Sequence, residues 1–107
     1  MPFYLHQWSY NHAPFREMLR AGDDRAEVVR TAVEAFGGTL HHFFYCFGEY
    51  DGTAIAEFPD REMALACLMS IFAEGRITAV HTTELFTVDE GGRAMQFAME
   101  AIRSPQD

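Results

Sequence analysis

Runs of aromatic and β-branched residues recur along this chain and are separated by glycine, proline and acidic residues. Such runs are typical of β-strands, and the residues between them are typical of turns and helix caps. The four runs are residues 3–10 (FYLHQWSY), 39–47 (TLHHFFYCF), 53–58 (TAIAEF) and 77–88 (ITAVHTTELFTV). The pattern therefore predicts four strands, and residues 39–47 carry the strongest strand signal.

Between these runs, apolar residues recur every three to four positions, which is the period of an amphipathic helix. The predicted helices span about residues 13–20, 25–36, 60–73 and 90–103. Asp24 with Glu27 has the form of a capping box, and Asp60 is a suitable cap for the third helix. We expect Asp89 to cap the last helix, whose apolar residues lie on one stripe.

The resulting order, β-α-β-β-α-β with one more helix, is typical of the ferredoxin-like split βαβ plan. We expect an α+β fold in which a four-stranded antiparallel sheet carries helices on one face. We also expect the strands 3–10 and 53–58 to lie side by side and parallel in its centre. A chain of 107 residues holds one domain, with its core at about residues 3–88 and the C-terminal helix at about 90–103.

The sheet face without helices is predicted to be apolar as well. In residues 39–47, simple alternation places Phe43 and Tyr45 on one side and Leu40 and Phe44 on the other. A free aromatic face of several hundred Å² is large for a soluble monomer. We therefore predict self-association, in which two sheets stack face to face as a dimeric α+β barrel or within a higher homo-oligomer.

Composition narrows the possible partners. Eight Lys and Arg against sixteen Asp and Glu give a formal charge of −8, which disfavours nucleic acid and anionic membranes. The chain shows neither a signal peptide nor an apolar run long enough to span a bilayer, so we expect a cytoplasmic, bacterial-type protein. The spacing of Cys46 and Cys67 matches no redox or zinc motif, and both are expected to be buried free thiols.

The segment GEYDG at residues 48–52 has two interpretations. As a hairpin loop, its glycines permit positive φ, Asp51 suits a tight turn, and Tyr50 packs back onto the sheet. As a binding site, Tyr50 and Asp51 stand at one mouth of the barrel, where they donate and accept hydrogen bonds. The residues themselves leave both interpretations open.

Titratable residues in the strands give a second candidate site. Glu57 lies inside an apolar strand, where a carboxylate needs a His or Arg partner or serves as a general base. If His6, Glu57 and His81 point to the same face, they form a catalytic acid/base cluster. Zinc or non-haem iron accepts such ligands. No local histidine motif supports a metal, and we expect neither a metal nor a cofactor.

Aromatic residues in such strands more often belong to the core than to a cofactor pocket; here they are Trp8, Phe43, Phe44, Tyr45 and Phe47. An aromatic-lined barrel nevertheless suits a flat apolar molecule. We therefore include Trp8, Phe43 and Tyr45 with Tyr50 and Asp51 as candidate ligand-binding residues, and expect a small apolar or aromatic ligand.

The segment FGEYDGTAIAEFPD resembles the signature of the GYD domain family of small bacterial proteins. The resemblance extends from Trp8-Ser9 through Phe36-Gly37-Gly38-Thr39 to Val80-His81-Thr82-Thr83 with Leu85. It implies a ferredoxin-like fold related to the dimeric α+β barrels, and it implies no particular reaction.

The leading interpretation is a homo-oligomeric small-molecule-binding or accessory protein. Barrels of the wider superfamily include cofactor-independent monooxygenases and isomerases, so an enzyme with an aromatic-lined pocket is the alternative. A purely structural or regulatory protein that assembles through the apolar helix at 60–73 is the third interpretation.

Overall fold

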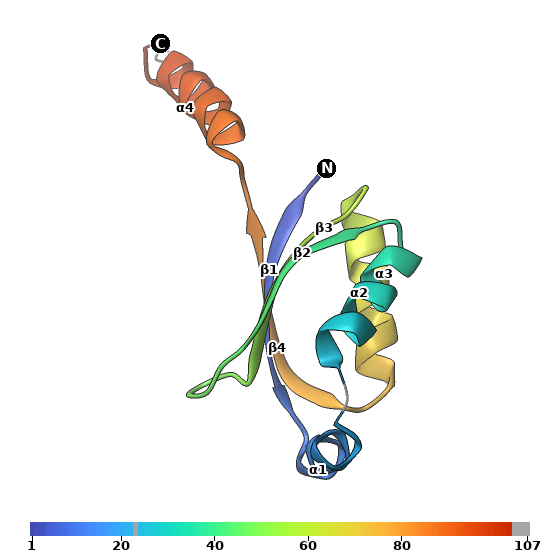
Figure 1. Cartoon of the computed structure of the whole chain (residues 1–107). Coiled ribbons are helices and arrows are strands. Elements are labelled where there is room, and N and C mark those ends of the chain that lie inside the picture. The colour runs from blue at the N-terminus through green and yellow to red at the C-terminus, as the bar shows by residue number, and fades with distance from the viewer. Residues whose placement is uncertain (23, 104–107) are drawn as a thin grey trace.

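The computed structural model describes residues 1–22 and 24–103 and shows an α+β chain with a four-stranded antiparallel sheet (Figure 1). Its elements, in order, are β1 (Phe3–Tyr10), α1 (His12–Ala21), α2 (Arg25–Ala35), β2 (Thr39–Tyr45), β3 (Gly52–Glu57), α3 (Arg61–Ala73), β4 (Ile77–Leu85) and α4 (Val88–Arg103). The predicted order of strands and helices is confirmed. The first crossover contains two helices, α1 and α2.

The strand order in the sheet is β2-β3-β1-β4, and every neighbouring pair is antiparallel. The expectation that β1 and β3 lie parallel was therefore wrong. The helical crossovers join β1 to β2 and β3 to β4, and one other strand separates the members of each pair. This arrangement is consistent with a ferredoxin-like fold.

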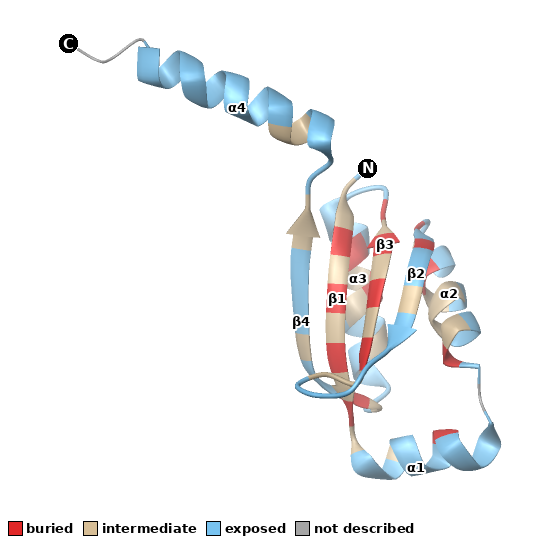
Figure 2. Ribbon diagram, turned by 60° about the vertical axis from the view of Figure 1, so that its left-hand side comes forward, coloured by how far each residue is buried: buried red, intermediate tan, exposed pale blue. Residues whose placement is uncertain are grey.

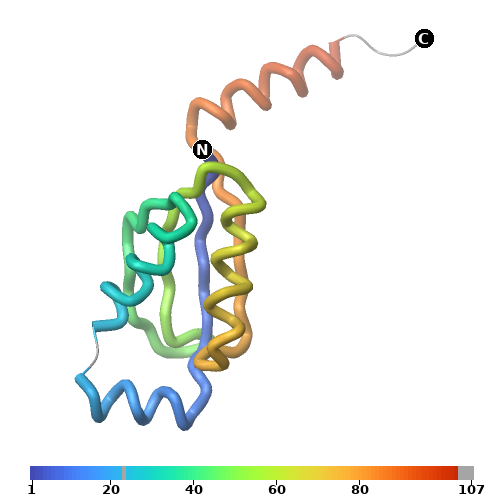
Figure 3. Tube along the Cα trace, turned by 90° about the vertical axis from the view of Figure 1, so that its right-hand side faces the viewer, coloured from blue at the N-terminus to red at the C-terminus, as the bar shows by residue number. Residues whose placement is uncertain are grey.

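Helices α2 and α3 cover one face of the sheet, with α2 over β2 and β3 and α3 over β1 and β4 (Figure 3). Buried and less buried residues alternate along β1 and β3, as Figure 2 shows by colour. The buried apolar core consists of Tyr4, Trp8, Tyr10, Met18, Val33, Leu40, Ala54, Ala56, Phe58, Ala64, Cys67 and Ile77. The core thus lies between the sheet and α2 and α3, while the other sheet face carries no helix.

N-terminal caps fix the starts of α2 and α3 at the residues that the sequence indicates. The side chain of Asp24 accepts a hydrogen bond from the backbone N–H of Glu27, and Asp60 does the same for Met63. These bonds satisfy N–H groups that the first turn of a helix otherwise leaves unpaired.

The predicted division of the β2 side chains between the two faces was wrong, because β2 contains a β-bulge. Leu40 lies opposite Ala56 whereas His42 lies opposite Ile55, so one residue, His41, is extra. The bulge reverses the alternation beyond it. As a result Phe43 packs against the core on the same side as Leu40.

The helix-free face, which we call the free face, is accordingly less aromatic than predicted. Its apolar side chains are Phe3, Leu5, Phe44, Ile55 and Leu85. Histidine, threonine, glutamine and glutamate side chains lie between them, so the free face is a mixed surface.

Helix α4 begins with a capping box, and the expectation that Asp89 caps this helix was wrong. Glu90 N–H donates to Thr87 Oγ1 at 3.1 Å, and Thr87 N–H donates to Glu90 Oε1 at 2.8 Å. Thr87 therefore caps the helix in place of Asp89, which lies in the first turn. The predicted strand at 77–88 consequently ends at Leu85.

Trp8 of β1 lies in close contact with Gly52, the first residue of β3 after the β2–β3 hairpin loop. A Cβ placed on Gly52 would lie 2.6 Å from Cε2 and Cζ2 of the Trp8 indole, so only glycine fits beneath this ring. Gly52 is also opposite Trp8 in the ladder between β1 and β3. Glycine at this position therefore allows the Trp8 ring to lie against the backbone of β3.

We expect Gly52→Ala to lower the free energy of unfolding by about 1–3 kcal/mol, because the added methyl group overpacks the Trp8 site. Urea unfolding monitored by Trp8 fluorescence would measure the change. Gly92→Ala is the control for an unhindered position: a Cβ on Gly92 in α4 meets nothing within 4 Å, so this substitution should not lower the free energy of unfolding. An unchanged stability of Gly52→Ala would show that the Trp8 ring is free to shift.

Candidate functional site

The GEYDG hairpin is fastened to the end of β1 through Asp51. The Asp51 carboxylate oxygen Oδ2 accepts a hydrogen bond from the Tyr10 N–H at 2.9 Å, and the Asp51 N–H donates to the Trp8 carbonyl at 2.8 Å. The Asp51 carbonyl in turn accepts from the Cys46 N–H at 2.9 Å. These bonds give Asp51 a structural part in the hairpin, and its proposed contact with a ligand stays a prediction.

Tyr50 from the same hairpin is close to His81 of β4. Its hydroxyl lies 3.4 Å from Nδ1 of His81, and the two rings meet edge to face. His81 is opposite Gln7 in the ladder between β1 and β4, which places this pair at one end of the free face. Tyr50 and Asp51 therefore stand next to each other in the chain but contact different parts of the sheet.

Glu57 has a histidine partner, as one sequence interpretation required, and that partner is His41. His41 Nε2 lies 2.9 Å from Glu57 Oε1, and the His41 ring is 5.4 Å from that of Phe3. The β2 bulge brings His41 to this position. A carboxylate that holds one nitrogen of an imidazole fixes the ring's orientation, an arrangement suited to acid/base chemistry.

His6 lies on the other face of the sheet and so does not join Glu57 and His81. It is buried beneath the helices, its Nδ1 is 3.0 Å from Thr82 Oγ1, and burial lowers its pKa to about 4. Side chains on one strand alternate between faces, and His6 is even-numbered on a β1 whose odd residues face the free side. The condition for a shared His6, Glu57 and His81 cluster is therefore not met.

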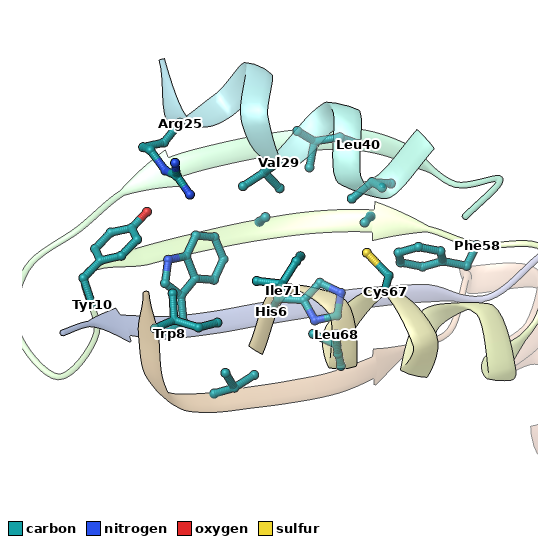
Figure 4. A pocket seen from close by; sticks show the side chains of 15 residues that line it. His6, Trp8, Tyr10, Arg25, Val29, Leu40, Phe58, Cys67, Leu68 and Ile71 are labelled. Carbon is teal, nitrogen blue, oxygen red and sulfur yellow. The ribbon is translucent and has the colours of Figure 1, made fainter. Parts of the chain in front are cut away.

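A small internal cavity of about 50 Å³ lies between the sheet and the helices (Figure 4). Its lining includes the aromatic residues Trp8, Tyr10 and Phe58, together with His6. Its walls are otherwise mainly aliphatic. The candidate residues His6 and Trp8 thus share one apolar cavity, whose volume admits only a very small molecule.

A larger, open pocket of about 480 Å³ lies between α1 and the β2–β3 hairpin. Its lining consists of Phe15, Met18, Leu19, Gly22, Arg25, Tyr45, Cys46, Phe47 and Asp51. We call it the α1 pocket. Its volume falls in the range of small-molecule sites, and it combines apolar walls with a few polar groups. Two of the predicted ligand-binding residues, Tyr45 and Asp51, therefore lie in one pocket.

Arg25 lines both the α1 pocket and the internal cavity, and so stands between them. It is only 8% exposed. Figure 4 shows its guanidinium pointing toward Tyr10. Burial raises the pKa of Tyr10, and the positive charge of Arg25 acts in the opposite direction. Arg25 is not among the site residues predicted from the sequence, where the only signal is a cation directly after the Asp24 cap.

The remaining candidate residues are divided between these regions. Phe43 lies against Trp8, with ring centroids 5.7 Å apart, and belongs to the covered core. Tyr45 is 61% exposed at the rim of the α1 pocket. Cys67 is buried, which raises its pKa to about 11, whereas Cys46 is exposed and the expectation of burial was wrong for it.

Together, the split βαβ sheet and the glycine-flanked hairpin fastened to its central strand define a small α+β domain with a pocket beside that hairpin. The GYD domain family model matches residues 4–95, and the chain belongs to this family. The resemblance seen in the sequence is thereby confirmed. No curated protein and no solved structure matches the chain.

The described residues contain neither a metal-ligand cluster nor a helix that could span a membrane. Within residues 1–22 and 24–103, no three His, Cys, Asp or Glu side chains gather as metal ligands. In the same part of the chain, no helix has the length and apolar character needed to cross a bilayer.

The buried His6 predicts acid sensitivity. Because its folded pKa of about 4 lies below the ordinary value of 6.5, the folded state favours the neutral ring. Its contribution to stability is complete above pH 6.5, falls as the pH decreases, and is lost below pH 4, a change of about 3 kcal/mol. Urea unfolding from pH 7 to pH 4 would measure it.

The comparison variant His6→Leu should lose this part of the pH dependence, whatever its stability at pH 7. His12→Leu is the control, since His12 is exposed on α1. An equally steep loss of stability in His6→Leu and in the unmodified protein would show that other groups cause the acid sensitivity.

Proposed function

We propose that this protein is a self-associating small-molecule-binding protein whose ligand occupies the α1 pocket. The observation that carries the proposal is that the buried Arg25 lines both this pocket and the internal cavity that contains Trp8. An open, ligand-sized pocket with mainly apolar walls and one buried cation in its lining is a usual arrangement for binding a small molecule.

The lining indicates the class of ligand. Phe15, Leu19 and Phe47 offer apolar contacts around the opening, and each is at least 40% exposed. Arg25 adds a positive charge to this lining, and that charge suits a ligand with a carboxylate or another acceptor group. The ligand is therefore an apolar or aromatic body that carries an acceptor group.

Self-association is supported by the free face. Leu5 of β1 is opposite Ile55 of β3, and Phe3 of β1 is opposite Leu85 of β4. Phe44 extends the apolar area onto β2 at the other edge. Stacking this face on that of a second copy would shield these side chains from water. The polar groups between them would then line the space shared by two sheets.

Binding of 2-naphthoate tests the pocket. The chain has one tryptophan, Trp8, which lines the cavity next to Arg25, so its fluorescence reports on occupancy. We expect saturable quenching by 2-naphthoate, and weaker binding of neutral 2-naphthalenemethanol. Leu19→Glu places a carboxylate at the pocket opening and should weaken 2-naphthoate binding by roughly tenfold through like-charge repulsion.

Phe97→Glu introduces the same charge at a residue of α4 that is 70% exposed, against 68% for Leu19, and it lies outside the pocket. It should leave the affinity unchanged. Absence of saturable quenching, or equal effects of the two substitutions, would contradict the α1 pocket as the binding site.

An enzyme is the second candidate function, favoured by one observation, the His41–Glu57 contact of 2.9 Å on the free face. The histidine would take a proton from a bound substrate while the carboxylate stabilises the resulting imidazolium. Within a shared space between two sheets, such a pair is compatible with monooxygenase- or isomerase-like chemistry that needs no cofactor. This support comes from the geometry of one pair and from analogy of fold.

Oxygen uptake with 1,4-dihydroxynaphthalene tests this second function, because deprotonation activates the quinol toward oxygen. We expect an enzyme to accelerate uptake, and His41→Ala to reduce the rate by roughly 10²-fold or more, as for loss of a general base. His12→Ala, at an exposed position of α1, should keep the full rate. Uptake equal to that in buffer, or equal in both variants, would count against a His41 base for this substrate.

A further inference from the structure

Helix α4 has an apolar stripe that nothing in the described chain covers. Val88, Met95, Met99 and Ile102 recur at helical spacing and are each between 46% and 91% exposed. No residue of α4 is buried. Isolated helices of this length are only marginally stable in water, and α4 also contains Gly91 and Gly92. A stable α4 therefore needs an apolar surface against which this stripe packs.

The start of α4 directs the helix away from its own domain. The Thr87–Glu90 capping box holds the chain immediately after β4, at Leu85–Val88. Figure 1 shows α4 leaving the end of the sheet and leaning to the side opposite α2 and α3. In Figure 2 the helix is coloured as exposed except for a short intermediate stretch near its start. Folding back onto its own helix layer would require a reversal of the chain where the capping box holds it.

The same molecule contains an open groove between α3 and β4, which we call the α3–β4 groove. One part of about 640 Å³ is lined by Tyr4, Arg61, Glu62, Ala64, Leu65, Leu68, Thr82 and Glu84, and the adjoining part of about 180 Å³ by Leu65, Leu68, Met69, Phe72 and Val80. Leu65, Met69 and Phe72 are each more than half exposed. The groove is thus a second apolar surface in contact with solvent.

We propose that α4 of one protomer lies in the α3–β4 groove of a second copy of this chain, with its apolar stripe inward, and that the exchange is reciprocal. The dimensions agree. At about 1.5 Å per residue, α4 is about 24 Å long and α3 about 20 Å long, so the stripe and the groove have matching lengths. This inference rests on the self-association proposed above and adds its second contact surface.

The area that a stable dimer needs favours a second copy as the occupant. Four strands of about seven residues give a free face of roughly 20 × 23 Å, about 450 Å² of projected area. Stable interfaces bury about 800 Å² on each partner. We call α4 the arm and its reciprocal docking the arm exchange. One arm and one α3–β4 groove per protomer, each roughly 24 × 10 Å, add about 480 Å² of projected area and bring the total into that range. The two contacts together therefore give about twice the projected contact area of stacked sheets alone.

A pair of substitutions on α4 tests the contact. Met95 and Phe97 are 71% and 70% exposed and lie on opposite sides of the helix, so only Met95 belongs to the stripe. We expect Met95→Glu to raise the dimer dissociation constant by tenfold or more, because it removes one apolar side chain that anchors the interface. Phe97→Glu should leave it unchanged. Light scattering over a dilution series would measure both.

The outcomes separate the two proposals. A monomeric unmodified protein at micromolar concentration would overturn the arm exchange together with the self-association. A dimer that Met95→Glu and Phe97→Glu weaken equally, or not at all, would overturn the arm exchange alone. Circular dichroism of each variant checks that the domain is folded.

Disulfide trapping distinguishes a second copy from the helix's own domain. Two proteins are made in a Cys46→Ser background, one with Met95→Cys and the other with Met69→Cys, both near the middle of their helices. Mixing them under mild oxidation should give a covalent heterodimer on a non-reducing gel. The corresponding pair Phe97→Cys and Met69→Cys should give little.

A chain that carries both Met95→Cys and Met69→Cys completes the test. Covalent dimers from this protein support the exchange. An exclusively intramolecular disulfide would mean that α4 returns to its own groove, and it would overturn the proposal, as would the absence of any Met95–Met69 crosslink in the mixture.

Discussion

The close contact between the Trp8 indole and the backbone of Gly52 is the constraint on which the other features depend. It brings the β2–β3 hairpin against the central strand, where the Asp51 carboxylate binds the Tyr10 N–H. The hairpin thereby forms one wall of the α1 pocket, and Trp8 forms part of the cavity behind it. The glycine and the aspartate of the GEYDG segment therefore act on the fold first, and any ligand site beside them depends on that support.

The two faces of the sheet provide different chemical environments, because strand geometry separates neighbouring side chains. On the helix side His6 is buried and held neutral, next to aromatic and aliphatic residues. On the free side His41 and His81 each contact a polar partner, Glu57 and Tyr50 respectively. The strand histidines therefore differ in their surroundings. The buried His6 makes stability depend on pH, whereas His41 and His81 supply polar groups to an open surface.

Helix α4 illustrates how a locally encoded element depends on a distant surface. Its start is specified by residues within one turn, Thr87 and Glu90, and its stripe by a simple period. Neither feature provides burial. A small domain hides a modest share of its surface, so an apolar helix outside the core is a usual source of association energy. In the described part of this protein, the free face and the α3–β4 groove are open apolar surfaces against which a helix such as α4 could pack.

The sequence by itself determined the strands, the helices, their order and the family, because these depend on local periodicity, caps and the GEYDG signature. It also indicated that Glu57 needs a partner. Which residue supplies that partner was decided only by the tertiary structure, since the bulge at His41 reverses the alternation of β2 and depends on pairing with β3. The same holds for Arg25 and the α1 pocket: residues far apart in the chain meet there only when the hairpin closes against β1, and no local pattern records that distance.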